Sequence, residues 1–249
     1  MQVAKDSNPG MERSRNEDSY YAEMDTRNAL LVVADGMGGH QAGNVASAMA
    51  IKVAENYWQD ISSNSSISAE NARQLLKDMI LDANQQIISE AAGTSTLRGM
   101  GTTLTAGLLR GSHLTIGHVG DSRAYRIHND SIELLTRDHS LLEQLIEAGE
   151  IRPEKAKNHP QRHILTRAVG IDNRLEVDIY EKEIESGSVL LFCTDGLTNQ
   201  VNDDEIKNIC LEDQNPQKMV SALIKKANDR GGHDNITVVV ATGIGGHQD

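Results

Sequence analysis

The stretch Leu30-Leu31-Val32-Val33-Ala34-Asp35-Gly36 places an apolar run directly before a carboxylate and a glycine. A short apolar run that ends in this way predicts a buried strand leading into a turn. The chain repeats the design with Thr194-Asp195-Gly196 after the apolar run 189–193, and varies it in Gly120-Asp121-Ser122 and His233-Asp234-Asn235. An isolated Asp-Gly pair is usually only a turn. Several acidic turns at the ends of apolar strands raise the alternative of one shared site of carboxylates, although their spacing does not show that they converge.

Helices and strands come in separate blocks around this stretch. Apolar residues at helical spacing predict one helix over residues 43–57 and another that starts at an N-cap Ser68 and carries its apolar stripe from Leu75 to Ile88. Further helices are expected over residues 139–149, 203–210 and 216–228, and strands over residues 102–109, 114–119, 122–127, 132–135, 175–180, 189–193 and 236–241. This segregation is typical of an α+β fold, because a parallel βαβ sheet would alternate the two kinds of element.

The composition fits a single large domain with an aliphatic core. The chain has 249 residues, of which 38% are hydrophobic but only 3% aromatic, so aliphatic side chains must fill the interior. The formal net charge of −12 repels nucleic acid and anionic lipid, so we expect neither as a partner. The first explanation for the excess of acidic residues is that they make the protein soluble. The alternative is that some of the carboxylates bind cations.

The two cysteines, Cys193 and Cys210, form no disulfide framework, which suits a reducing compartment. Neither is followed by the arginine that a cysteine nucleophile needs to clamp a phosphate, so both are interpreted as buried small hydrophobic residues. Residues 1–10 are polar and lack the apolar core of a signal peptide, and no stretch resembles a membrane span. We therefore expect a cytoplasmic protein.

Carboxylates that converge on a small volume cannot all stay ionised without cations. Oxygen ligands favour Mg²⁺ or Mn²⁺ over zinc, and Gly36 after Asp35 would let a backbone carbonyl approach such an ion. Arg13 lies shortly before the acidic pair Glu17-Asp18 and has the fork geometry that matches phosphate oxygens, although an exposed arginine on a solvated strand is the commoner case. The glycine-rich segment 36–43 lacks the spacing of a nucleotide-binding loop.

Eight short motifs follow one another along nearly the whole chain: Arg13–Asp18, Asp35–His40, Gly101–Thr103, Gly120–Arg123, Leu135–Ser140, Thr166–Gly170, Cys193–Leu197 and Gly232–Asn235. Together they resemble the metal-dependent protein serine/threonine phosphatases of the PPM (type 2C) family, in their compact bacterial form. Each motif is weak alone, but eight in family order are a specific signal. The resemblance implies a four-layer α-β-β-α sandwich, in which two antiparallel sheets are flanked by helix pairs.

The resemblance also implies two Mn²⁺ or Mg²⁺ ions at one end of the sandwich and a third, weaker site. By position it implies that Asp35 bridges two ions, that Asp195 and Asp234 complete one of them, and that the Gly36 carbonyl binds the other. Asp121 would join Asp195 at the third site, and Arg13 would bind the substrate phosphate. Glu17, Asp18 and Asn235 would lie behind the metal ligands, where the two acids hold metal-bound waters. A single catalytic domain would span residues 1–243, with a flap at about 139–162 and a tail at 244–249.

The implied reaction is the hydrolysis of phosphoserine or phosphothreonine in proteins by a hydroxide that bridges two metals, without a covalent intermediate. The implied substrates are phosphoproteins made by a cognate serine/threonine kinase, and we expect a monomer. The chain departs from the better-known eukaryotic pattern at Met37, where those members carry a histidine as candidate general acid. His40 lies nearby as the alternative donor, and a metal-bound water could serve instead.

Two other functions stay open at this point. A catalytically weak phosphoprotein-binding regulator on the same fold predicts missing carboxylates, and none is missing here. Another two-metal enzyme, such as a phosphodiesterase or a nuclease, is disfavoured because a net charge of −12 repels a polyanionic substrate.

Overall fold

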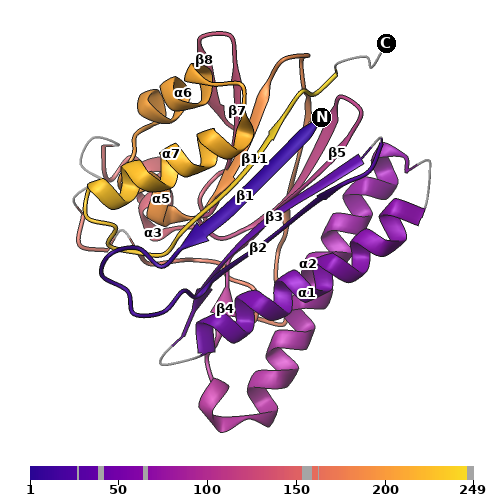
Figure 1. Cartoon of the computed structure of the whole chain (residues 1–249). Helices are drawn as coiled ribbons and strands as arrows, with labels where there is room; N and C mark the ends of the chain where they lie inside the picture. Colours follow the sequence, from indigo (N-terminus) through magenta and orange to yellow (C-terminus); the bar gives the residue numbers. More distant parts are fainter. Residues whose placement is uncertain (27, 39–41, 64–66, 153–158, 162, 246–249) are drawn as a thin grey trace.

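Two antiparallel sheets pack face to face and carry helices on both outer faces in a computed structural model of the chain, which describes residues 1–26, 28–38, 42–63, 67–152, 159–161 and 163–245 (Figure 1). The predicted α+β class and the four-layer sandwich are confirmed. Buried side chains of one sheet face those of the other in the middle layer, as expected for sheets that each hide an apolar face.

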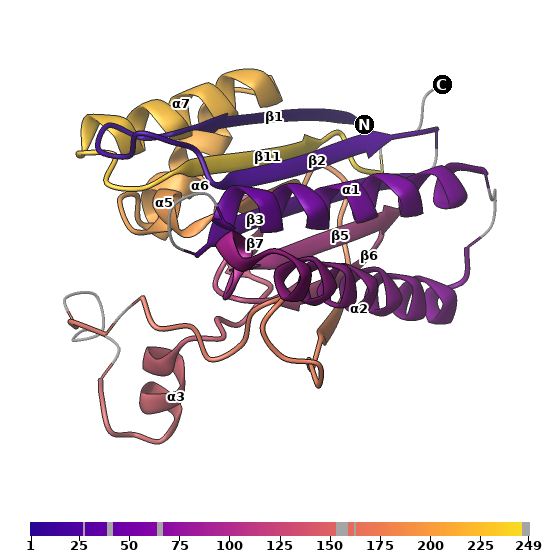
Figure 2. The same cartoon turned by 90° about the horizontal axis from the view of Figure 1, so that it is seen from below.

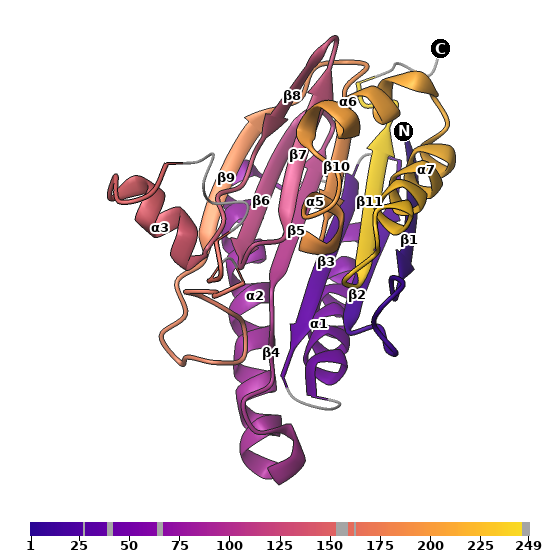
Figure 3. The same cartoon turned by 90° about the vertical axis from the view of Figure 1, so that its left-hand side faces the viewer.

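The first sheet has the strand order β1 (Gln2–Asn8), β11 (Ile236–Thr242), β10 (Val189–Cys193), β7 (Arg123–His128) and β8 (Ser131–Leu134). The second has the order β2 (Asp18–Met24), β3 (Asn28–Met37), β5 (Leu104–Arg110), β6 (His113–Val119) and β9 (Asp178–Glu183), while the short β4 (Gly101–Thr102) pairs with the end of β3. Figure 3 shows one sheet lying over the other, with the strands of both running along the length of the molecule.

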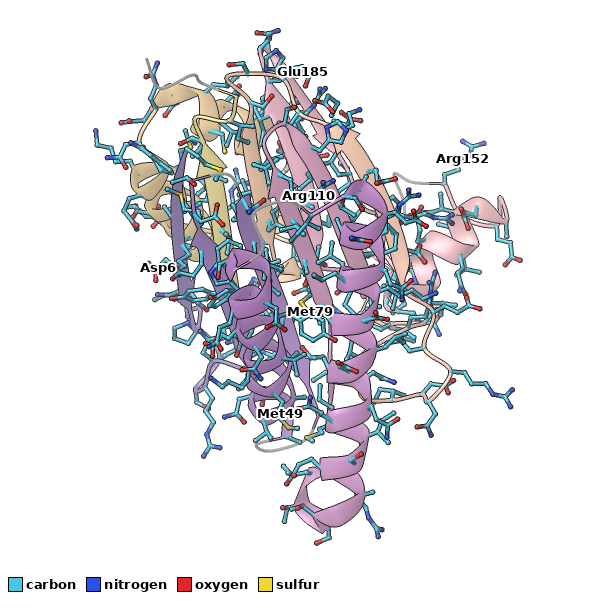
Figure 4. All side chains as sticks on the ribbon, turned by 90° about the vertical axis from the view of Figure 1, so that its right-hand side faces the viewer. Asp6, Met49, Met79, Arg110, Arg152 and Glu185 are labelled. Atoms are coloured by element: carbon cyan, nitrogen blue, oxygen red, sulfur yellow. The ribbon has the colours of Figure 1, made fainter. Side chains whose placement is uncertain are left out.

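Two long helices, α1 (Ala42–Ser63) and α2 (Ala69–Gly93), cover the outer face of the second sheet (Figure 2). The outer face of the first sheet is covered by α5 (Asp195–Thr198), α6 (Asp203–Glu212) and α7 (Pro216–Asp229). Among the described residues there are also a short 3₁₀ turn, η1 (Ser95–Leu97), and α3 (Leu141–Glu147), which stands out from the body of the sandwich in Figure 2. Figure 4 views the molecule from the α1/α2 side, with Met49 on α1 and Met79 on α2.

Side-chain alternation along the strands divides the interior into separate layers. On β3, Leu30 and Val32 pack against α1 and α2, whereas Leu31 and Val33 face the other sheet. The same period of two places Phe192 of β10 between the sheets. A Cβ at Gly107 of β5 would overlap the Phe192 ring, so the glycine makes room for the largest buried side chain that faces it across the sandwich.

Most predicted elements lie where the sequence placed them, with shifted ends. Ser68 caps α2 as predicted, accepting a hydrogen bond from the backbone N–H of Asn71 at 3.1 Å. The prediction for residues 175–180 was wrong in its boundaries, because the strand there is β9. No strand was predicted for β1 or β2, whose polar, partly exposed sequences carry little apolar signal. None of the helices in the described ranges has the length and hydropathy to span a membrane.

A candidate metal centre at the polar end of the sandwich

The rows of side chains between the two sheets change from apolar to polar at one end. On β3 the row Leu31, Val33 continues to Asp35, and on β2 the directly paired residue is Asp18. Across the sandwich, Phe192 of β10 is followed two residues later by Thr194, and the row on β11 begins at Thr237. In Figure 1 the strands run from upper right to lower left, and the segment between β1 and β2, the end of β3 and α5 lie toward their left-hand ends.

Asp35 is held by its backbone at the end of β3. Its N–H donates to the Thr103 hydroxyl at 2.9 Å, and its carbonyl accepts from the Thr103 N–H and the Thr102 hydroxyl, both at 2.9 Å. Burial raises the pKa of the Asp35 carboxyl well above its ordinary value, and the charges of Asp18, Asp195, Asp121 and Asp234 raise it further. Carboxylates from four separate segments therefore act on one side chain.

Asp195 and Asp234 come from the opposite sheet. Asp195 opens α5, and its Oδ2 accepts from the Asn199 amide at 3.0 Å, while its Oδ1 is buried without a hydrogen-bond partner. Burial and the Asp234 charge raise the pKa of Asp195. Asp234 precedes β11, and its Oδ2 pairs with the Arg13 guanidinium at 2.9 Å.

Asn235 joins this loop to the N-terminal segment. Its Oδ1 accepts from the Glu17 N–H at 2.8 Å, and its amide donates to the carbonyls of Pro9 at 3.0 Å and Arg15 at 2.9 Å. Three separate backbone groups of the segment between β1 and β2 are thus tied to one buried side chain. These bonds bring Arg13 and Glu17 beside Asp234.

Gly36, Gly43 and Glu17 meet at close range on the other side of Asp35. A Cβ on Gly36 would overlap the Gly43 carbonyl, and a Cβ on Gly43 would overlap a Glu17 carboxylate oxygen. The absence of side chains at these two positions leaves the Gly36 carbonyl and the Glu17 carboxylate next to one another. Burial raises the pKa of Glu17, with Arg13 opposing and Asp234 adding to the shift.

The expected third-site residue also lies in this polar region. Burial raises the pKa of Asp121 well above its ordinary value, and the charges of Asp195 and Asp138 add to the shift, against Arg123. Arg123 itself is engaged by Asp138, with an Nη2–Oδ2 distance of 2.6 Å. Asp121 therefore has no tight cationic partner of its own among the described side chains, and it lies within electrostatic range of Asp195.

The donor set fits a hard divalent cation, although it is not preformed. No three His, Cys, Asp or Glu side chains of the described residues stand close enough, as they are, to hold one ion. Asp234 is paired with Arg13, and this contact would open when a cation enters. Buried oxygens without partners, Oδ1 of Asp18 and Oδ1 of Asp195, and the raised carboxyl pKa values both indicate missing positive charge.

His40 lies outside the described residues, and so does part of the predicted flap. The described flap root is anchored by His139, which is buried, accepts from the Gly120 N–H at 3.2 Å and lies 3.2 Å from an Asp178 oxygen. Burial alone would raise the pKa of Asp178, but hydrogen bonds from Arg167 and His139 outweigh it and lower the pKa. Arg152, beyond α3, lies well away from the two long helices (Figure 4).

Several hydroxyl groups of this region have a role that was not predicted from the sequence. Thr103, Thr194 and Thr237 are buried and bond directly to Asp35 or Asp18. Their signal was the alternation along each strand, which places a threonine at the end of an inward-facing row. Threonine is common in strands for other reasons, so that signal alone is not specific.

Three comparisons with known proteins agree on one family. The family described as "Protein phosphatase 2C" matches residues 11–214. The chain is 40% identical to the serine/threonine phosphatase stp of Listeria welshimeri over 233 residues, which cover 93% of this chain and 91% of that one. It superposes on the serine/threonine phosphatase PstP/Ppp of Mycobacterium tuberculosis with a TM-score of 0.87 at 35% identity, covering 97% of each chain. A further solved structure, the catalytic domain of the phosphatase PstP in complex with two manganese ions, gives a TM-score of 0.85 at 33% identity over 97% of each chain.

Proposed function

The chain belongs to the protein phosphatase 2C family and is a protein serine/threonine phosphatase, and we propose that its carboxylate end is a metal-dependent centre for hydrolysis of phosphoserine and phosphothreonine. One observation carries the proposal. Five aspartates from separate segments come together at this end: Asp18, Asp35, Asp121, Asp195 and Asp234. The charges of the other four raise the pKa of the buried Asp35 carboxyl. Such a concentration of buried negative charge is costly for folding and calls for cations.

The residues that would hold the ions are those that converge. Asp35 would bridge two cations, Asp195 and Asp234 would complete one, the Gly36 carbonyl would bind the other, and Asp121 would serve a third, weaker site. The all-oxygen donor set favours Mn²⁺ or Mg²⁺. When bound, two such ions would lower the pKa of a water between them and so supply a nucleophile for direct hydrolysis, without a covalent intermediate.

Arg13 is positioned to hold the substrate phosphate. Its guanidinium is largely exposed and now pairs with Asp234 at 2.9 Å. With Asp234 engaged in holding a cation, that pairing would lose its electrostatic advantage, and the planar fork of Arg13 would be available for two phosphate oxygens. Glu17 and Asp18 would accept hydrogen bonds from waters at the centre, and Asn235 would keep the Arg13 segment in place through its three backbone contacts.

The wider setting of the reaction follows from the same proposal. We propose that residues 1–243 act as one catalytic domain with a flap at about 139–162, in a cytoplasmic monomer. Its substrates would be phosphoproteins of a cognate serine/threonine kinase, and the net charge of −12 disfavours nucleic acid. For the leaving alkoxide, His40 and a metal-bound water stay as the two predicted proton donors.

Phosphate release from a phosphoserine peptide tests the proposal. Wild-type protein, Asp234→Ala and the control Asp229→Ala would be assayed with Mn²⁺ and with a chelator, beside a phosphodiester substrate. Asp229 is a matched control because it is an exposed aspartate on α7 that pairs only with Lys225 among the described contacts. We expect activity on the phosphopeptide alone, dependent on Mn²⁺, retained in Asp229→Ala and nearly abolished in Asp234→Ala. Full Mn²⁺-dependent activity of Asp234→Ala would contradict the assignment.

A further inference from the structure

Asp18 receives two hydroxyl groups from the opposite sheet on a single oxygen. The Thr194 hydroxyl donates to Asp18 Oδ2 at 2.8 Å, and the Thr237 hydroxyl donates to the same atom at 2.7 Å. Asp18 belongs to β2, whereas Thr194 directly follows β10 and Thr237 lies in β11. All three side chains are buried. These two bonds therefore connect the sheets inside the polar end of the sandwich.

The hydrogen bonds around this oxygen all run toward it. A hydroxyl has one proton to donate, so once Thr237 donates to Asp18, the Ser7 hydroxyl 2.7 Å away must donate to Thr237. The Asn16 amide in turn donates to Ser7 at 2.7 Å. The Thr194 hydroxyl likewise donates its proton to Asp18, and its oxygen accepts from the Thr237 N–H at 3.0 Å. This direction suits a carboxylate that only accepts.

The other oxygen of Asp18 is left free by this arrangement. Oδ1 is buried and has no hydrogen-bond partner, so the two hydroxyls fix the carboxylate through one oxygen and leave the other to a further donor. Asp18 is directly paired with Asp35 on β3, and side chains of directly paired residues point to the same face. The Asp18 side chain, which carries the free oxygen, therefore lies on the same inner face of the second sheet as Asp35.

The two threonines also adjoin the residues expected to bind metal. Thr194 is the neighbour of Asp195, and Thr237 stands three residues after Asp234. The backbone N–H of Thr194 donates to the Thr237 carbonyl at 3.1 Å, so the two segments are joined to each other as well as to Asp18. One cluster of three side chains thus fixes the strand partner of Asp35 relative to the segments that carry Asp195 and Asp234.

From this geometry we propose that Thr194 and Thr237 are positioning residues that act through Asp18, orienting its free oxygen toward the cation-bound water of the centre and setting the affinity for Mn²⁺. The inference rests on the proposed function, because it takes the carboxylate end to be the metal centre. Simple packing would be served equally well by valine, which has the shape of threonine. What the hydroxyl groups add is the pair of hydrogen bonds that orient the Asp18 carboxylate, beside the bond that Thr194 accepts from the Thr237 N–H.

Calorimetric titration with Mn²⁺ separates the two roles. We expect Thr194→Val and Thr237→Val to weaken Mn²⁺ binding by roughly 10-fold or more, the usual effect of losing a partner behind a metal ligand. Thr194→Ser and Thr237→Ser keep the hydroxyl and should keep the wild-type Kd. In the Asp18→Asn background neither valine should weaken binding further, because both act through the same carboxylate. Thr242→Val, at the other end of β11, is the control and should bind as wild type.

Kinetics provide the second measurement. At subsaturating Mn²⁺ the valine variants should show a lower kcat, recovered as Mn²⁺ is raised, with an unchanged KM for the phosphopeptide. If a valine variant fails to fold, Asp18→Asn takes its place, because it removes the carboxylate through which both threonines act. We expect a weaker Mn²⁺ affinity, and a wild-type affinity would overturn the proposal. Valine variants with the wild-type Kd would also overturn it, as would serine variants as weak as valine. A wild type that binds no Mn²⁺ would instead overturn the proposed function itself.

Discussion

The middle and the polar end of the interior are built from the same strands, yet they differ completely in chemistry. In the middle, Leu31, Val33 and Phe192 are fully buried among apolar neighbours. Two residues further along the same inward-facing rows stand Asp35 on β3 and Thr194 directly after β10. Position along the strand, and not the kind of element, therefore separates the structural core from the candidate site.

The difference shows how one fold can hold a costly site. Burying an apolar side chain such as Phe192 stabilises the protein by about 1.5–3 kcal/mol. Burying several carboxylates does the opposite, as the raised pKa values of Asp35, Asp121 and Asp195 show. The apolar middle keeps the two sheets together and so holds the carboxylates near one another before any cation binds. A substitution at the polar end should consequently affect metal-dependent activity, and a substitution in the apolar middle should affect stability.

The largest expected effect is on activity, at Asp35. Asp35→Asn keeps the shape of the side chain and removes the charge that would bridge two cations. We expect the Mn²⁺-dependent kcat to fall at least on the order of 10²-fold, as when one electrostatic group is removed from a reaction centre. Without Mn²⁺ the variant should melt at the same temperature as wild type or higher, because a buried carboxyl among carboxyls is gone. Lower thermal stability without metal would show that Asp35 stabilises the fold itself.

The matching change in the middle is Phe192→Ala. It should destabilise the protein by about 3–5 kcal/mol, since a large buried ring is lost beside Gly107, which cannot fill the space. For a chain of this size that lowers the Tm by roughly 6–20 °C, as measured by thermal unfolding. The Kd for Mn²⁺, measured below the transition, should stay at the wild-type value. An equally large loss of Mn²⁺ affinity would mean that the two regions are not separable.

Part of this division could be predicted from the sequence. The apolar run that ends on Asp35 and the turns at Asp195 and Asp234 already indicated strand ends carrying carboxylates. Sequence alone could not show that Thr194 and Thr237 bond to Asp18, because these partners are 176 and 219 residues apart in the chain and meet only when the sheets pack. For the same reason β2 was missed: its polar residues make sense only opposite β3. Patterns within one strand are local, whereas contacts between sheets are not.

A smaller effect is expected from pH in the metal-free protein. Burial raises the pKa of Asp18 from 3.8 to about 7, against hydrogen bonds from Thr237 and Thr194 that lower it. Between pH 3.8 and about pH 7 the folded state therefore binds more protons at Asp18 than the unfolded state does. The contribution of Asp18 to the free energy of unfolding is fully present below about pH 4 and is lost as the pH rises toward 7. The shift corresponds to as much as about 4 kcal/mol for Asp18.

Thermal unfolding in the presence of a chelator measures this pH effect. We expect a lower Tm at about pH 8 than at about pH 5, and a larger stabilisation by Mn²⁺ at the higher pH, because cations bind the ionised carboxylates of the native state. Asp18→Asn should flatten the profile. A metal-free Tm that rises over this range would contradict the raised pKa values of the cluster.

The smallest effect is expected at Cys193, next to the polar end but on the other face of its strand. Cys193 packs with the apolar cluster beneath α6 and α7, while its neighbour Thr194 faces Asp18. Burial raises the pKa of the Cys193 thiol, and no part of it is exposed, so little reactive thiolate should form. Iodoacetamide should therefore leave Mn²⁺-dependent activity unchanged in the folded protein, while mass spectrometry finds both cysteines modified after unfolding. If native protein were alkylated at Cys193 and lost activity, the strand alternation that separates the two faces would not hold at this end of the sandwich.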